Sequence, residues 1–82
     1  MYGPLLEALR SGKSSEAVTT SDTVELRPMR QLYIGTGGTI VGRLRDDTAD
    51  RTWSNIPDGT TLDWDFKLIK TASTASGMVA IR

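Results

Sequence analysis

The sequence contains few residues that could carry out chemistry. Of its 82 residues none is Cys and none is His. This excludes thiolate and imidazole zinc ligands, Cys or His nucleophiles, and the usual general base at neutral pH. A glycine-rich stretch, an acidic loop, a pair of aspartates and one Ser-Asp pair remain as candidates. For each of them a structural role competes with the chemical one.

The glycine-rich stretch is Gly35-Thr36-Gly37-Gly38. A phosphate-binding loop needs a helix after its glycines, because the N-terminus of that helix faces the phosphate. Here Thr39-Ile40-Val41 follows, which is β-branched and typical of a strand, and the P-loop lysine is missing. We therefore predict a tight hairpin turn at Gly37-Gly38 between two short strands.

Acidic residues gather in one predicted loop, at Asp46, Asp47 and Asp50. A calcium loop supplies several oxygen ligands and needs a glycine at its sharp bend, but no glycine interrupts this loop. Three arginines flank it: Arg43, Arg45 and Arg51. The pattern favours a solvated, charge-balanced turn over a metal site.

Asp63 and Asp65 occupy positions i and i+2 of a predicted strand, so their carboxylates could lie about 6–7 Å apart. Glycoside hydrolases use similar separations, but they also need a cleft and one desolvated acid. Charges that protect an edge strand from aggregation are the simpler interpretation. Ser21-Asp22 lacks a His or Lys arrangement to activate the serine. We predict no catalytic, cofactor-binding or metal-binding residue and a protein that is not an enzyme.

The charges of the chain balance, with 10 Lys plus Arg against 10 Asp plus Glu. A neutral chain lacks the long-range field that attracts nucleic acids or anionic membranes. Tyr33 and Trp53 remain as stacking platforms for single-stranded nucleic acid, but basic residues do not concentrate near them. No apolar run approaches the roughly 20 residues that cross a bilayer. We expect neither a nucleic acid nor a membrane as partner.

The elements that must position these residues are of two kinds. Over Met1–Ser15 the apolar residues recur at i, i+3, i+4 and i+7, which predicts a helical arm. A helix this short is marginal in water, so its stripe must pack on its own domain, on a sister subunit or on a different protein. Ser11–Ser15 is typical of a flexible hinge. The stripe consists of Tyr2, Leu5, Leu6 and Leu9.

Residues 16–82 are typical of a β-rich domain, punctuated by turns such as Pro57-Asp58-Gly59. The strongest predicted strand is Leu62–Lys70, in which Trp64 and Phe66 alternate with charged residues and are expected in the core. Trp53 is expected in core packing or in a subunit contact. The sequence predicts an all-β fold, a small antiparallel sandwich or barrel with a short N-terminal helical arm. The other predicted strands are Glu16–Thr20, Gln31–Gly35, Thr39–Leu44, Arg51–Ile56 and Met78–Arg82.

Four stretches follow one another along residues 16–82: Ala17–Thr23, Leu32–Gly38, Asn55–Thr60 and Thr71–Arg82. In this order they resemble the small head spike base proteins of tailed phages and gene transfer agents. That family typically reads AVTPSD, alYVGtGG, vPaGtxlp and tgTTAsxivAlY in these blocks. The sequence departs from the family where Thr20 replaces a proline, Asp63 an apolar residue or proline, and Arg82 an aromatic residue.

The resemblance implies a virion structural protein on the outer capsid surface, made in the bacterial cytoplasm. It would be a head spike base or capsid decoration protein that anchors a spike or fibre to the capsid, without catalysis. The implied partners are the capsid protein, the spike or fibre protein and further copies of the chain in a homo-oligomeric ring, with a pentamer as the candidate.

Two questions about contacts remain open at this stage. The arm could grip the capsid or a neighbouring subunit, or it could fold back on its own sheet. The candidate partner-interface residues are Tyr2, Leu5, Leu6, Leu9 and Trp53. The alternative function is a carbohydrate- or receptor-binding module of a phage spike or tail, which would need Trp53 exposed to its ligand.

Overall fold

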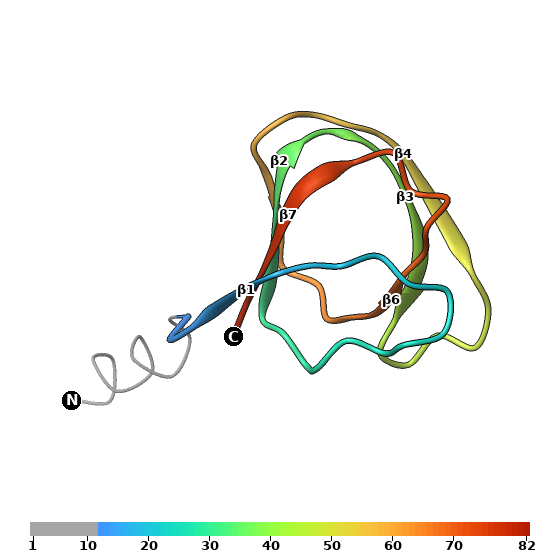
Figure 1. The fold of residues 1–82 in the computed structure, drawn as a ribbon, viewed down its shortest axis with the longest axis horizontal. Coiled ribbons are helices and arrows are strands. Elements are labelled where there is room, and N and C mark those ends of the chain that lie inside the picture. The colour runs from blue at the N-terminus through green and yellow to red at the C-terminus, as the bar shows by residue number, and fades with distance from the viewer. Residues whose placement is uncertain (1–11) are drawn as a thin grey trace.

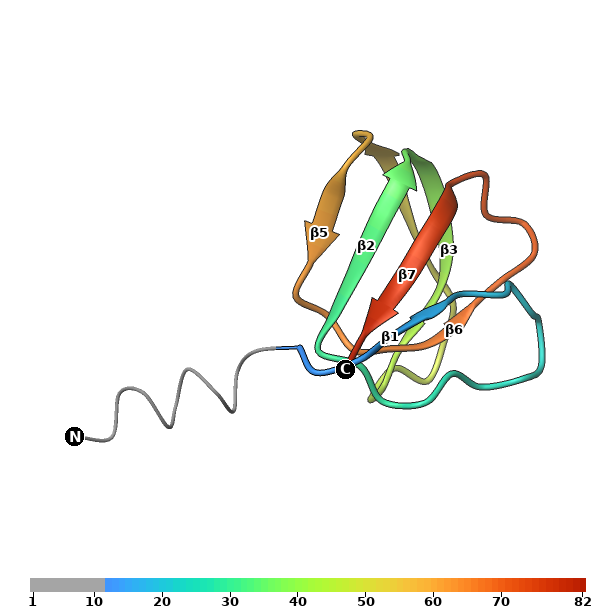
Figure 2. The ribbon, with the colours of Figure 1, turned by 60° about the vertical axis from the view of Figure 1, so that its left-hand side comes forward.

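The computed structural model describes residues 12–82, which form seven strands in two antiparallel sheets (Figures 1 and 2). The four-stranded sheet A has the order β1-β7-β2-β5, and the three-stranded sheet B has the order β4-β3-β6. The predicted antiparallel β architecture is confirmed. The strands are β1 (Ser15–Ala17), β2 (Gln31–Thr36), β3 (Gly38–Leu44), β4 (Arg51–Ile56), β5 (Thr60–Leu62), β6 (Phe66–Ile69) and β7 (Ser76–Ile81).

The predicted helical arm lies outside the described residues, apart from its last four positions. Within residues 12–82 no helix is long and apolar enough to cross a membrane.

The core fills the space between the two sheets. Alternate residues of β2 and β7 point inward, as the sequence pattern predicts for half-buried strands. The described part of the chain has no buried polar or charged side chain, so the interior carries no unpaired charge. The largest fully buried side chains are Phe66, Leu32, Ile34, Ile40 and Ile69.

The prediction of one continuous strand over Leu62–Lys70 is wrong. It is divided into β5 in sheet A and β6 in sheet B, and residues 63–65 cross between the sheets. Leu62 and Trp64 nevertheless pack against the same core that buries Phe66. Because the core lies between the sheets, alternate residues keep facing it while the chain changes sheets. The alternation therefore identified the inward face and could not reveal the crossing.

The predicted hairpin at Gly37-Gly38 is also wrong, because β2 and β3 belong to opposite sheets. Gly37 alone separates the two strands and carries the chain across the sandwich. A Cβ atom at Gly37 would overlap the carbonyl oxygen of Ile56. Only glycine lets the two backbones approach this closely.

The predicted turn at Pro57-Asp58-Gly59 is present, and it too connects the two sheets, from β4 to β5. Gly59 has φ of +74°, which favours glycine. The carboxylate of Asp58 accepts a hydrogen bond from the Gly37 amide at 2.6 Å. This hydrogen bond therefore links the β2–β3 connection to the β4–β5 connection.

The first described residues are attached to the end of the sheet. The Lys13 and Ser14 amides donate to the carbonyl oxygen of Arg82, and the Arg82 amide donates back to Ser14. Part of the segment predicted as a hinge thus continues the pairing of β1 with β7. β1 is shorter than the predicted strand Glu16–Thr20 and begins one residue earlier.

Residues 18–30 form a long connection that closes one side of the sandwich (Figure 1). The Val18 amide still donates to β7, whereas the amides of Ser21 and Leu26 donate to carbonyl oxygens of β6. The chain therefore passes from the edge of sheet A to the edge of sheet B. This bridge gives the sandwich a barrel-like closure on that side.

Candidate interaction surfaces

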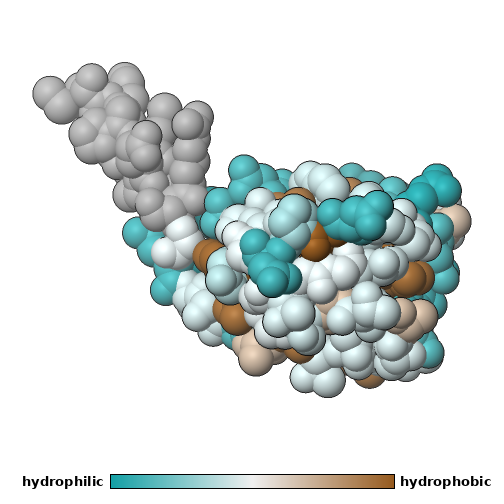
Figure 3. Space-filling view, turned by 90° about the horizontal axis from the view of Figure 1, so that it is seen from above, coloured by the Kyte–Doolittle hydropathy of each residue, from teal (hydrophilic) through white to brown (hydrophobic). Residues whose placement is uncertain are grey.

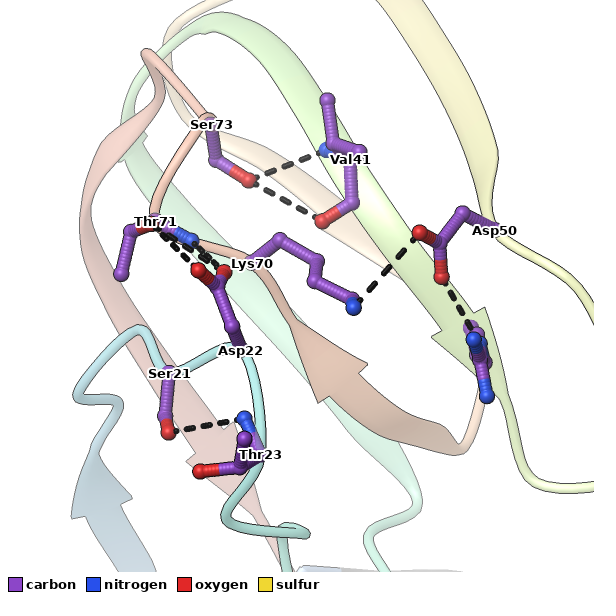
Figure 4. Close-up of polar contacts among 9 residues, drawn as sticks. Ser21, Asp22, Thr23, Val41, Asp50, Lys70, Thr71 and Ser73 are labelled. Carbon is purple, nitrogen blue, oxygen red and sulfur yellow. Dashed lines mark hydrogen bonds and ion pairs between the residues drawn. The ribbon is translucent and has the colours of Figure 1, made fainter.

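The acidic loop is a charge-balanced turn, as predicted. Asp47 accepts a hydrogen bond from the Leu44 amide at 3.1 Å and stabilises the turn that ends β3. Asp50 lies between Arg43 at 2.7 Å and Lys70 at 3.5 Å (Figure 4). The hydrogen bond from Arg43 is the main cause that lowers the pKa of Asp50. No three metal-ligating side chains gather within the described part of the chain.

Asp63 and Asp65 do not form a carboxylate pair on one strand face, because they lie in the crossing between the sheets. Asp63 accepts a hydrogen bond from the Gln31 side chain at 2.8 Å. Asp65 accepts two hydrogen bonds from Arg45, at 3.0 and 3.1 Å, and one from the Met29 amide. Arg45 also donates to two backbone carbonyls. These contacts fix the path of the chain and do not assemble a catalytic pair.

Asp65→Asn is expected to remove a pH-dependent part of the stability. The Arg45 hydrogen bond holds the pKa of Asp65 below its usual value. The carboxylate therefore stabilises the fold above its unfolded pKa of about 4, and this contribution is lost as the pH falls through the folded pKa. Because the side chain is 35% exposed, solvent screening limits the cost at pH 7 to about 1 kcal/mol. Urea unfolding of the wild type and of Asp65→Asn at pH 7 and near pH 3 measures this difference in the free energy of unfolding.

The control is Asp63→Asn, which removes the charge of the exposed partner of Gln31. Its stability difference from the wild type should be small at both pH values. An Asp65→Asn difference that is equally large near pH 3 would contradict the assignment to the ionised carboxylate.

The stretches that carry the family resemblance form the corners of the sandwich. Gly37 and Asp58 bond to each other across two of the connections. The amide and carbonyl of Val41 both bond to the hydroxyl of Ser73, and the Thr39 amide donates to the hydroxyl of Thr74. Each contact connects β3, or the residue just before it, to one of the connections between the two sheets. The resemblance therefore rests on residues that build this fold.

The Ser21-Asp22 pair also has a structural role (Figure 4). The Ser21 hydroxyl accepts hydrogen bonds from the amides of Thr23 and Val24 and stabilises a local turn. The Asp22 carboxylate accepts from the amide and the hydroxyl of Thr71. These bonds attach the closing segment to the residues that follow β6, so both side chains have a role in holding the fold.

Trp53 lies in β4 and is partly buried. Its ring packs against Trp64 at a centroid distance of 5.6 Å and edge-on against Phe66 at 5.5 Å. Such aromatic pairs add to the stability that burial alone provides. The cluster lies between an edge strand of sheet B and the crossing after β5. Core packing of Trp53 is thus observed, and its contact with a partner stays a prediction.

The connections β2–β3, β4–β5 and β6–β7 meet at one end of the sandwich, which is seen from above in Figure 3. Residues of intermediate hydropathy cover much of this end, and the hydrophilic residues form separate groups. Five of the ten residues in these connections are serine, threonine or glycine, and the two charged ones are Asp58 and Lys70. This end offers a weakly polar surface with few charges.

A surface that the sequence reasoning missed is the outer face of sheet A. The register places Tyr33 opposite Thr61 on one side and Val79 on the other. Tyr33 is 41% exposed. The sequence did contain an indication of this surface. The outward positions of β2 and β7 lack the charged residues expected of a solvent-facing sheet. The outward residues are Ser15, Ala17, Gln31, Tyr33, Gly35, Thr61, Gly77, Val79 and Ile81.

No protein-family model matches this chain, and no curated protein matches it significantly. Among solved structures, the fold matches a chain of the "Capsid of native GTA particle computed with C5 symmetry". The TM-score is 0.75 at 27% sequence identity, and the match covers 87% of this chain and 83% of that chain. The protein is therefore similar to a chain of a gene transfer agent capsid.

This similarity extends beyond a single motif. The match covers 87% of this chain, which is more than the four sequence stretches together make up. It agrees with the family resemblance at the level of particle type, because gene transfer agents are part of that expectation. The stripe Tyr2, Leu5, Leu6 and Leu9 lies outside the described residues, so its contacts remain a prediction.

Proposed function

We propose that this protein is a structural component of a phage-like particle, such as a gene transfer agent, in which it forms the head spike base. In this role it anchors a spike or fibre protein to the capsid protein on the outer surface. It works by binding and does not catalyse a reaction. It is synthesised in the bacterial cytoplasm and joins the particle during assembly.

The observation that carries the proposal is the match to a chain of the GTA capsid. At 27% identity over most of both chains, the match supports a virion structural protein. The finer assignment to a spike base is supported by the four ordered sequence stretches and by their roles at the corners of the fold. The polar contacts of the described acidic residues, which serve the fold, also favour a structural role.

A homo-oligomeric ring of five copies is part of the proposal. The number five is compatible with the similar capsid, which was computed with C5 symmetry. A cyclic ring needs two different patches on each copy, because each subunit contacts its neighbours head to tail. Within residues 12–82, β1 and β5 are the edge strands of sheet A and β4 is an edge strand of sheet B, and these edges are candidates for such contacts. Small domains often gain stability in this way.

The test is to delete the gene in the producing bacterium and to image the purified particles by cryo-electron microscopy. We expect intact capsids that lack their spikes, and spikes restored by the wild-type gene. The restored protein should copurify with the particles. Particles that keep their spikes without the gene, or a protein absent from purified particles, would refute the proposal.

A further inference from the structure

A turn within residues 18–30 presents an apolar side chain to solvent. The amides of Ser21 and Leu26 donate to carbonyl oxygens of β6 and attach both ends of this turn to sheet B. Between them the Ser21 hydroxyl accepts hydrogen bonds from the amide of Thr23, as Figure 4 shows, and from that of Val24. Val24 is nevertheless 69% exposed, more than any other large hydrophobic side chain of residues 12–82. The Val24 turn, residues 21–26, therefore fixes this side chain in place without burying it.

Negative charge is in excess beside the Val24 turn. Glu25 and Asp46 are exposed, and neither forms an ion pair with another of residues 12–82. Both lie near Arg45, whose pKa is raised first by its hydrogen bond to Asp65 and further by the charges of Glu25 and Asp46. Because Asp65 already balances Arg45 at 3.0 Å, these two carboxylates leave the surface acidic.

Arginines surround a pocket at the other end of the same segment. The Arg82 guanidinium donates to the carbonyl oxygens of Arg27 and Pro28 and so holds the wall of the pocket. The Arg30 amide donates to the carbonyl oxygen of Ile81 and attaches the segment to β7. The pocket is therefore formed by backbone bonds before any partner binds. This arginine pocket has a volume of about 250 Å³ and is lined by Pro28, Met29, Arg30 and Arg82.

Positive charge is in excess around the arginine pocket. The Arg82 guanidinium lies 3.5 Å from the Glu16 carboxylate. Arg27 and Arg30 are exposed, and neither forms an ion pair within the described part of the chain. Lys13 adds another exposed cation, since its amide is bonded to the Arg82 carbonyl. With a proline and a methionine in its lining, the pocket fits an apolar side chain that is accompanied by a carboxylate.

The Val24 turn and the arginine pocket lie on different sides of the molecule. The turn is bonded to β6 of sheet B, whereas Arg30 is bonded to β7 of sheet A, and the segment runs between them (Figure 1). The bonds to β6 hold Val24 away from the pocket of its own chain. Two different patches on each copy are what a cyclic ring requires, because its subunits meet head to tail.

We propose that the Val24 turn of one copy docks in the arginine pocket of the next copy. This inference rests on the proposed ring and names the contact that forms it. Val24 meets the apolar lining of the pocket, and Glu25 faces Arg30 of the neighbour. The apolar contact provides the favourable burial, and the match of charges sets partner and register. Each copy forms the contact twice, so closure of the ring strengthens a contact that is weak by itself.

Charge balance favours a second copy over a different protein as the occupant. The chain has 10 cationic and 10 anionic residues, and the excess charges of the two surfaces are of opposite sign. A contact between copies neutralises both surfaces at once. An acidic segment of another protein would fill the pocket and leave the Val24 turn uncovered.

The test measures association of the full chain by sedimentation velocity over a series of protein concentrations. Arg30→Glu places like charges opposite each other and should raise the dissociation constant about tenfold or more. Glu25→Arg combined with Arg30→Glu exchanges the two charges and should restore association to near that of the wild type. Val24→Ser removes the apolar contact and should weaken association several-fold.

Arg51→Glu is the matched control. Arg51 is an exposed arginine of the edge strand β4, and its reversal changes the net charge by the same amount as Arg30→Glu. The dissociation constant of this variant should equal that of the wild type. All the substituted side chains are exposed, so the urea unfolding curves of the variants should stay close to that of the wild type.

Four results would overturn the inference. A wild-type chain that stays monomeric over the whole series would exclude the contact, and a charge exchange that fails to restore association would exclude the pairing of Glu25 with Arg30. An effect of Arg51→Glu as large as that of Arg30→Glu would assign assembly to the strand edges. An Arg30→Glu variant that associates normally but no longer binds purified particles would assign the pocket to another protein. Association is measured on the isolated protein, so its failure is distinct from that of the gene deletion experiment.

Discussion

Gly37→Ala is expected to destabilise the protein by about 3 kcal/mol, the upper end of what overpacking usually costs. The added Cβ would overlap the carbonyl oxygen of Ile56 and press on the backbone of the following turn. These are main-chain atoms that cannot move aside like a flexible side chain. Relief would separate the β2–β3 and β4–β5 crossings and stretch the hydrogen bond from Gly37 to Asp58. Denaturant unfolding of the purified variant measures the loss.

Gly59→Ala is the matched control at the same corner. Gly59 has φ of +74°, and a Cβ there would meet no atom within 4 Å. Gly59→Ala should lower the free energy of unfolding by about 1–2 kcal/mol, because an alanine is unfavourable at a positive φ. Asp58→Ala removes the bracing hydrogen bond without a clash, at about 1 kcal/mol. If Gly37→Ala cost no more than these two variants, the close approach of the backbones would not be the reason for the glycine.

The sequence was informative about which segments are strands and which side chains face inward. Arg51–Ile56 is a strand over its predicted span, and Phe66 is buried in the core as the alternation predicted. After a register shift in the pairing of β3 with β6, Ile69 joins the core cluster in place of Leu68. These predictions succeed because alternation and turn chemistry are local properties. The turn at Pro57–Gly59 was predictable for the same reason, since its residue types restrict φ locally.

Local alternation and turn chemistry could not predict which strands belong to which sheet. A glycine pair between two strands is typical of a hairpin, and the same pair also permits a crossing when another backbone lies against it. The deciding contact comes from Ile56, far along the chain. Similarly, the segment after Leu62 leaves its sheet because Arg45 and Met29 hold Asp65. Such long-range contacts leave no periodic signal.

The candidate interface was predicted in part. Trp53 was recognised as a packing or contact residue, and its packing is visible in the aromatic cluster. The outer face of sheet A was not predicted, because no single strand contains enough of its apolar residues to indicate a surface. Ala17, Val79 and Tyr33 belong to three strands, and only the register brings them into one row.

Phe66→Ala is expected to be among the most destabilising single substitutions, with a loss of about 3–5 kcal/mol. Phe66 is fully buried and packs against both tryptophan rings, at centroid distances of 5.5 and 5.9 Å. The alanine would leave a cavity between the sheets. For a domain of 82 residues, whose total stability is on the order of 4–12 kcal/mol, this loss could unfold the protein. Phe66→Leu keeps most of the volume and provides a variant that remains measurable.

Trp53→Phe separates packing from partner contact within the same cluster. Phenylalanine keeps an aromatic ring beside Trp64 and Phe66, so the free energy of unfolding should fall by only about 1 kcal/mol. Trp53 lies in an edge strand and is only partly buried, so a neighbouring protein has access to it. If Trp53 contacts a partner, Trp53→Phe should reduce incorporation into particles much more than a core variant of equal stability, such as Phe66→Leu. Incorporation that simply follows stability in both variants would limit Trp53 to a packing role.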